Sequence, residues 1–244
     1  MTAHPIPVGA GPVPPAAPPG GAAKPLIVLK CGGAVAKDAA EAILALAAAH
    51  DVVVVHGAGP QISAEMERRG LEVRFVNGRR YTTAAALEVV RESLAEVNGA
   101  LCSAIGPRAA GFMGDELGLE AAQVSKLGLV GDPLPSRPAL VLSALREGRI
   151  PVVAPLAKGP LNVNADEAAV ALAAGLGAER ILFVTDVPGV LVDGDVVSSI
   201  GADEADRLLD DGTFQGGIVP KLQAAVRAAR LGMRAEIGET VVLG

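Results

Sequence analysis

The sequence predicts an α/β protein, a three-layer αβα sandwich around a mainly parallel sheet. Three stretches carry the continuous apolar runs of buried parallel strands, and they read PLIVLKCGG, DVVVVHGAGP and RILFVTDVPGVL. Stretches rich in alanine and leucine separate them, and strands that alternate with helices favour a parallel sheet between helical layers. Half of the 244 residues are hydrophobic but only 2% are aromatic, so we expect a core of alanine, valine, leucine and isoleucine.

The elements follow in order after a tail. Residues 1–24 are rich in proline, glycine and alanine and are predicted to be disordered, with one folded domain over residues 25–244. Asn77-Gly78 predicts a hairpin turn within VRFVNGRRYTT, Pro188-Gly189 predicts a turn, and the glycine-rich residues 111–137 predict a small antiparallel excursion. Further strands are expected in RIPVVAPLA, MRAEIG and TVVLG. Helices are expected over about 38–49, from the HGAGP turn to 69, and over 84–96, 98–108, 138–148, 166–176, 202–212 and 221–232.

The composition argues against several classes of function. The net charge of −6 is unlike the basic face of a general nucleic-acid binder. The apolar runs are too short to span a bilayer, and the N-terminus lacks the basic start of a secretory signal. Cys31 and Cys102 lie far apart without metal-ligand spacing and are predicted to be reduced packing residues. We therefore predict a cytoplasmic protein with no metal site of its own and no nucleic-acid or membrane partner.

Glycine-rich turns follow the first two predicted strands. In KCGG and HGAG the small residues would let backbone N–H groups approach an anion at a helix N-terminus. Ligands of parallel sheets bind at the carboxyl ends of the strands, where Lys30, His56, Gly57 and Asp186 fall. The chain lacks the dinucleotide-binding G-x-G-x-x-G pattern and the phosphate loop G-x-x-x-x-G-K-S/T. A different loop would therefore bind any phosphate.

Several charged side chains are candidates for binding or catalysis. Lys30 ends an apolar strand beside glycines, which favours a position in the ligand crevice. Lys221 lies at a predicted helix start, where the helix dipole disfavours a cation and an anion would compensate it. Arginine recognises carboxylates with two parallel hydrogen bonds; for Arg79 that role and a solvated hairpin position both remain open. His56 is a possible general base, but a hydrogen-bonded structural role ranks above it.

The stretch LNVNADEAAV places Asn162, Asn164 and Asp166 two residues apart ahead of a helix. A helix start needs one capping oxygen, whereas alternate residues of an extended segment point the same way, toward a common ligand. On this stretch alone, an ordinary N-cap with polar neighbours and a ligand-binding rim both remain open.

Six motifs together resemble those of the amino acid kinase superfamily, and within it the N-acetylglutamate kinase family. They are KCGG, VVVHGAGPQI, FVNGRRYTT, NVNADEAAVALA, ILFVTDVPGVL and GGIVPKLQAA. They occur in the family's order and cover most of the chain from Lys24 to Met233. The resemblance implies an amino acid kinase-like fold. A lobe of about residues 25–160 would bind the acyl amino acid, and a lobe of about residues 161–244 would bind the nucleotide.

The resemblance implies ATP-dependent phosphorylation of the side-chain carboxylate of N-acetyl-L-glutamate, in arginine biosynthesis, with Mg²⁺ held mainly by the nucleotide phosphates. Carried over by position, Lys30 and Lys221 would stabilise the transferring phosphoryl group, and Asp166 would hold the two lysines in place. A γ-carboxylate with a pKa of about 4.3 is already an anionic nucleophile at neutral pH, so no general base is required. The alternating Asn-x-Asn-x-Asp would then be a ligand rim that also starts a helix.

The resemblance also assigns binding residues to both ligands. The acyl amino acid would contact the backbone N–H groups of Gly57 and Ala58, the side chain of Arg80 through its α-carboxylate, and Asn162 through its acetamido end. The nucleotide would contact Gly32, Gly33, Asp186, Val187, Pro188, Gly189, Val190, Leu191, Thr213, Phe214 and Gln215.

The sequence departs from the family pattern at three places. Ala58 replaces the middle glycine of HGGG, and Ile218 stands where the family usually has methionine. After MRAEIG the family usually has a helix and a GIGT turn near the nucleotide, whereas here ETVVLG ends the sequence. We expect substrate binding to survive these changes and nucleotide affinity to be the property at risk.

Two alternative functions and the assembly remain to be considered. One alternative is a kinase for N-acetylated or carrier-linked aminoadipate, which is one methylene longer; the other is a non-catalytic, ligand-sensing homologue, against which the two lysines and Asp166 argue. Hexameric, arginine-inhibited members of the family carry an extra N-terminal helix. The proline- and glycine-rich residues 1–23 cannot propagate such a helix, so we predict a homodimer without arginine feedback.

Overall fold

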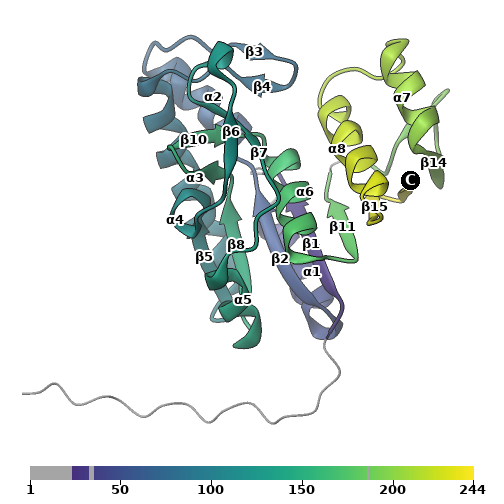
Figure 1. Ribbon diagram of the computed structural model, residues 1–244, viewed down its shortest axis with the longest axis horizontal. Coiled ribbons are helices and arrows are strands. Elements are labelled where there is room, and N and C mark those ends of the chain that lie inside the picture. Colours follow the sequence, from purple (N-terminus) through teal and green to yellow (C-terminus); the bar gives the residue numbers. More distant parts are fainter. Residues whose placement is uncertain (1–23, 33–35, 186) are drawn as a thin grey trace, which may run out of the picture.

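The computed structural model describes residues 24–32, 36–185 and 187–244, and an eight-stranded sheet lies at the centre of this part of the chain (Figure 1). The strand order is β14-β16-β15-β11-β1-β2-β8-β5. In that order the strands span Ser199–Gly201, Thr240–Leu243, Arg234–Ile237, Arg180–Phe183, Leu26–Cys31, Asp51–His56, Ile150–Ala154 and Ala109–Met113. Among these described strands only the β15–β16 pairing is antiparallel. The carboxyl ends of β11, β1 and β2 therefore meet in the middle of one sheet edge.

Helices cover both faces of the sheet, which confirms the predicted three-layer sandwich. One face packs against α1 (Ala36–Ala49) and α3 (Ala84–Ile105), where Ile43 and Leu101 meet Leu29 and Val54. The other face packs against α5 (Ala139–Arg146), α6 (Ala165–Leu176) and α8 (Ile218–Arg230) (Figure 1). The remaining described helices are α2 (Gly59–Arg68), which packs on α3, α4 (Gly114–Leu117), the 3₁₀ turn Ser125–Leu127 and α7 (Ala202–Asp210).

Strand alternation decides which side chains reach which layer. On β1, Val28 belongs to the core under α6, whereas Leu29 and Cys31 belong to the core under α1. Successive side chains of a strand point to opposite faces, so Lys30 points toward the α6 layer. On β2 the same alternation turns His56 toward the α3 layer.

Smaller sheets lie beyond the carboxyl edge of the main sheet. A four-stranded sheet has the order β6-β7-β10-β9, with bounds Ala121–Gln123, Val130–Pro133, Leu161–Val163 and Leu156–Ala157. Two hairpins pair β3 with β4 and β12 with β13, with bounds Phe75–Val76, Arg79–Arg80, Leu191–Val192 and Asp195–Val196. Asn77 and Gly78 have φ angles of 48° and 74°, as a hairpin turn with two left-handed residues requires. The predicted Asn-Gly turn is therefore confirmed.

The prediction of separate helices over 84–96 and 98–108 is wrong, because α3 runs without a break from Ala84 to Ile105. Asn98 does not interrupt it: its side chain is buried and donates hydrogen bonds to the Val152 carbonyl and to the His56 ring. A polar residue inside a helix is compatible with burial when the core supplies its partners.

The expected excursion over residues 111–137 also begins too early. Its first part belongs to β5 (Ala109–Met113), which pairs in parallel with β8 at the edge of the main sheet. Position 111 has no room for a side chain because α3 crosses this strand closely: a Cβ on Gly111 would collide with the side-chain oxygen of Asn98. The rest of the stretch contains β6 and β7, which are antiparallel as expected.

The described helices include none with both the length and the apolar composition needed to cross a bilayer. Apart from Lys24, the predicted tail over residues 1–24 falls outside the described residues.

Candidate functional site

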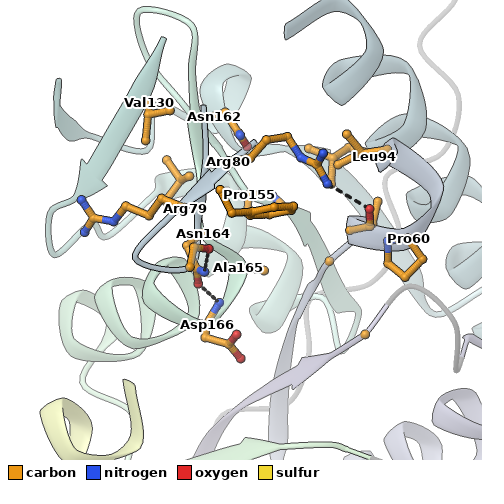
Figure 2. A pocket seen from close by; sticks show the side chains of 18 of the residues that line it. Pro60, Arg79, Arg80, Leu94, Val130, Pro155, Asn162, Asn164, Ala165 and Asp166 are labelled. Carbon is orange, nitrogen blue, oxygen red and sulfur yellow. Dashed lines mark hydrogen bonds between the residues drawn. The ribbon is translucent and has the colours of Figure 1, made fainter. Parts of the chain in front are cut away.

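Two cavities lie beyond the carboxyl ends of β1, β2 and β11. The first, of about 260 Å³, is bounded by the ends of β1 and β2, the start of α2, the β3–β4 hairpin and the segment that leads into α6 (Figure 2). The second, of about 450 Å³, is bounded by the segment after β11 and the start of α8. Lys30 and Asp166 line the first cavity and Lys221 lines the second.

A lysine–aspartate–lysine cluster joins the two cavities. The ammonium groups of Lys30 and Lys221 lie 2.9 Å and 3.5 Å from the same carboxylate oxygen of Asp166. Burial, and to a lesser extent the charge of Lys30, lower the pKa of Lys221 against the opposing attraction of Asp166. With both lysines protonated the cluster has one excess positive charge in a poorly solvated position, and such a position favours a bound anion.

Three different elements place these side chains. Lys30 stands near the carboxyl end of β1, Asp166 in the first turn of α6, and Lys221 in the first turn of α8. Helix N-termini carry partial positive charge, which stabilises Asp166 and destabilises Lys221. The carboxylate of Asp166 therefore compensates a cation that the local backbone disfavours.

The alternating polar residues have three separate roles (Figure 2). The side-chain oxygen of Asn164 accepts hydrogen bonds from the backbone N–H groups of Asp166 and Glu167, so Asn164 is the N-cap of α6. Asn162 donates to the hydroxyl of Thr82 at 3.0 Å, and Asp166 holds the lysines. Because Asn162, Asn164 and Asp166 all line the first cavity, the stretch is both a cap and a cavity wall.

The start of α2 presents backbone N–H groups to the first cavity. The N–H of Gly57 donates to the Cys31 carbonyl at 2.9 Å and is used within the sheet. The first-turn N–H groups of a helix lack partners inside the helix, and Ala58, the N-cap, and Gly59 are the residues at this helix start that both carry an N–H and line the cavity. The methyl group of Ala58 belongs to the apolar cluster between α2 and α3.

Arg79 and Arg80 point in opposite directions from β4 (Figure 2). Arg80 is buried; it donates to the Gly59 carbonyl at 3.1 Å and to the Ser63 hydroxyl at 2.8 Å. Its guanidinium carbon lies 4.6 Å from the centre of the Phe75 ring. Within the described part of the chain no carboxylate forms an ion pair with Arg80, and burial lowers its pKa. Arg79, by contrast, forms ion pairs with Asp132 and Glu167.

His56 lies on the opposite face of the sheet from Lys30. Its ring is fully buried and its Nε2 accepts a hydrogen bond of 3.1 Å from the amide nitrogen of Asn98, which can only donate. Burial lowers the pKa of His56 to about 4, so the ring is neutral at physiological pH. Burial likewise raises the pKa of the Cys31 thiol to about 11, and Cys31 packs in the core under α1 as predicted.

The residues expected at the nucleotide divide into three groups. Val187, Gly189, Leu191, Phe214 and Gln215 line the second cavity together with Lys221. Pro188, Val190 and Thr213 flank it: the Pro188 carbonyl accepts from Glu239, the Val190 N–H donates to Thr240, and Thr213 bonds to Asp211. Gly32 lines the first cavity instead, and Gly33 and Asp186 lie outside the described residues.

Several lining residues were missed by the sequence analysis. Phe75 and Gly59 line the first cavity, and Thr185 and Gly217 line the second. Gly59 could have been found from its place at a helix start, whereas nothing in the sequence pairs Phe75 with Arg80. Among the described residues there is no group of three histidine, cysteine, aspartate or glutamate side chains that could hold a metal ion.

Comparison with known proteins identifies the family. The family model described as the amino acid kinase family matches residues 25–239. An acetylglutamate kinase of Roseiflexus castenholzii is 41% identical over 228 residues, covering 87% of this chain and 88% of that protein. An acetylglutamate kinase of Geobacillus stearothermophilus is 40% identical over 218 residues, covering 83% of this chain and 84% of that protein.

Solved structures show the same architecture. The smu.665 protein of Streptococcus mutans superposes with a TM-score of 0.82 at 27% identity, covering 89% of this chain and 98% of that chain. Carbamate kinase from Giardia lamblia bound to AMP-PNP superposes with a TM-score of 0.67 over 91% of this chain and 99% of that chain; its identity of 14% shows a shared fold alone. On the family match and the relatives of about 40% identity, this chain belongs to the amino acid kinase family.

Proposed function

We propose that this protein is an acetylglutamate kinase, which transfers the γ-phosphoryl group of ATP to the side-chain carboxylate of N-acetyl-L-glutamate. The observation that carries the proposal is the position of Asp166, which binds a lysine of each cavity through one oxygen. A group that passes between the cavities would cross this cluster. The proposal is supported by the names of the relatives of about 40% identity and by the family of the chain.

The chemistry demanded by this reaction matches the side chains present. An acceptor carboxylate is already ionised at neutral pH, so no base has to remove a proton, and the neutral His56 lies on the other face of the sheet. Phosphoryl transfer depends chiefly on positioning and on neutralising charge. In the proposal, Lys30 and Lys221 neutralise the charge of the phosphoryl oxygens and Asp166 fixes the positions of the two ammonium groups.

The first cavity is assigned to the acyl amino acid. Arg80 is a buried guanidinium without a carboxylate partner among the described ion pairs, and the α-carboxylate of the acceptor would supply that partner. Asn162 is assigned to the acetamido end, and the N–H groups of Ala58 and Gly59 are assigned to the oxygens at the reacting end. Gly57, whose N–H is used within the sheet, would contribute a small cavity wall.

The second cavity is assigned to ATP. Its described lining is largely apolar, with Phe214, Leu191 and Ile218, and places Lys221 at the side of the cluster. Its described lining contains no carboxylate. In the proposal, a magnesium ion would take its ligands mainly from the nucleotide phosphates. When bound, the ion supplies charge neutralisation between the nucleotide oxygens. We keep the cytoplasmic location and the homodimer without arginine feedback as predictions. Light scattering would test the homodimer, and assay with added arginine would test the absence of feedback.

The experiment that tests the function compares acceptors side by side. ATP is supplied with N-acetylglutamate, N-acetylaminoadipate, aspartate or UMP, and both ADP release and trapping of the acyl phosphate by hydroxylamine are measured. We expect the highest kcat/KM with N-acetylglutamate and hydroxamate formation in proportion to ADP. Hydroxamate only with N-acetylaminoadipate, or none with any acceptor, would overturn the proposal.

A further inference from the structure

Arg79 lies in the wall of the first cavity and joins three elements there, with its guanidinium pointing away from Arg80 (Figure 2). Its guanidinium lies 2.8 Å from Asp132 on β7 and 3.0 Å from Glu167 on α6, and its Nε donates to the same Glu167 oxygen at 3.1 Å. The side chains of Arg79 and Glu167 are only 19% and 24% exposed. Partial burial reduces the solvent screening that makes most surface ion pairs ineffective.

The two ends of this bridge are neighbours of proposed active-site residues in the chain. Arg79 precedes Arg80, the proposed partner of the α-carboxylate, and Glu167 follows Asp166, which holds the two lysines. A second contact runs parallel to the bridge, because the amide of Asn164 donates to the Gly78 carbonyl at the hairpin turn at 3.3 Å. The β3–β4 hairpin is thus fastened directly to the N-terminal turn of α6.

The separation between Arg80 and the lysine–aspartate–lysine cluster determines which acceptor fits. A dicarboxylic acceptor would place its α-carboxylate at Arg80 and its reacting carboxylate at the cluster. The distance between Arg80 and the cluster would therefore decide how many methylene groups the acceptor can have between its two carboxylates. The hairpin pairs only two residues on each strand, and short isolated hairpins are not rigid by themselves. An external contact has to set its position.

We propose that Arg79 is a positioning residue that sets acceptor length: its bridge to Glu167 and Asp132 holds Arg80 at a separation from the lysine cluster that suits a glutamate skeleton. Arg79 does not touch the acceptor in this account; it acts through Arg80. The inference rests on the proposed function, which supplies the identities of the two ligands.

The test measures selectivity rather than activity alone. Arg79→Gln, Arg79→Lys, Glu167→Gln and the double variant Arg79→Gln/Glu167→Gln are assayed with N-acetylglutamate, N-acetylaminoadipate and N-acetylaspartate. The double variant leaves no unpaired carboxylate at position 167 and guards against failure to fold. Arg180→Gln is the matched control, because it removes an ion pair of 2.9 Å between Arg180 on β11 and Glu236 on β15. Arg180 is the first residue of β11, whereas the two cavities lie beyond the carboxyl ends of the strands.

A single methylene in a fitted site changes kcat/KM by about 10- to 200-fold. We expect the preference of the native protein for N-acetylglutamate over N-acetylaminoadipate to fall about tenfold in Arg79→Gln and in the double variant. The cause should be a raised KM for N-acetylglutamate, with a smaller change in kcat. Arg79→Lys, which keeps one ion pair, should recover part of the preference, and Arg180→Gln should keep all of it.

The outcomes separate the two proposals. An equal loss with all three acceptors, or an unchanged preference, would show that Arg79 only supports the fold and would overturn the inference. Equal turnover of the three acceptors by the native protein would overturn it too, while the kinase activity stands. Absence of turnover with every acceptor would instead overturn the proposed function, and with it the proposal that Arg79 sets acceptor length.

Discussion

Replacing Asp166 by asparagine would remove the one negative charge between two buried ammonium groups while nearly keeping the side-chain shape. Lys30 and Lys221 have side chains only 9% and 12% exposed, so water from the cavities compensates only part of the lost charge. Breaking a buried ion pair by removing one partner costs about 3–5 kcal/mol. We expect the free energy of unfolding of Asp166→Asn to fall by about this amount at pH 7.

The pH dependence of this loss follows from Lys221. Burial already lowers its pKa, and the variant also loses the opposing attraction of Asp166. Its folded pKa then lies further below the unfolded value, so the unfolded chain binds more protons between the two, and stability rises with pH over that window. The deficit of Asp166→Asn should therefore shrink as the pH is raised toward the usual lysine pKa of 10.5.

Urea denaturation at several pH values measures both effects. Asp206→Asn is the control, since it removes an ion pair of 2.7 Å with Arg230 in which both side chains are more than 40% exposed, and such pairs contribute at most about 1 kcal/mol. If Asp166→Asn were as stable as this control at pH 7, the two ammonium groups would not depend on Asp166 and the electrostatic account of the cluster would be wrong.

Three further predictions address single residues. Lys221→Ala should lower kcat far more than it weakens acceptor binding, because its charge acts on the transferring group; a normal kcat with only a raised KM for ATP would exclude that role. Arg80→Lys should raise the KM for N-acetylglutamate by about tenfold or more, because lysine cannot reproduce the two parallel hydrogen bonds; an unchanged KM would place the α-carboxylate elsewhere. Burial lowers the pKa of His56 from 6.5 to about 4. Between these pH values the unfolded chain binds a proton at His56 and the folded protein does not, so the free energy of unfolding falls by about 3 kcal/mol as the pH drops from 6.5 toward 4. The variant His56→Gln should flatten the pH dependence of unfolding over that window, and an equal slope in both proteins would contradict the assignment.

The centre of the fold was predictable because its signals are local. Continuous β-branched runs mark β1, β2 and β11, and parallel strands bring their carboxyl ends to one edge whatever the rest of the chain does. The placement of Lys30 in the ligand crevice follows from that rule alone. The anion expected opposite Lys221 proved to be a carboxylate of the protein, Asp166, with space for a further anion beside it.

The contacts that the sequence could not predict join distant segments. Arg79 was left open between a ligand partner and a solvated residue, and its partners Asp132 and Glu167 lie 53 and 88 residues further along the chain. The prediction of a helix break near Asn98 was wrong for the same reason, because the hydrogen-bond partners of the Asn98 side chain are on β2 and β8. Local propensity says nothing about partners that only the folded chain supplies.

The central claim is that an acceptor carboxylate attacks the γ-phosphorus between the two lysines, and an isotope label tests it directly. N-acetylglutamate with ¹⁸O in both oxygens of its side-chain carboxylate is incubated with unlabelled ATP, and hydroxylamine then cleaves the acyl phosphate at its carbonyl carbon. The bridging oxygen leaves with phosphorus in this cleavage. We predict that the released phosphate contains one ¹⁸O atom per ADP formed, as measured by ³¹P NMR. Unlabelled phosphate in the same amount would mean that water is the nucleophile and would contradict the account.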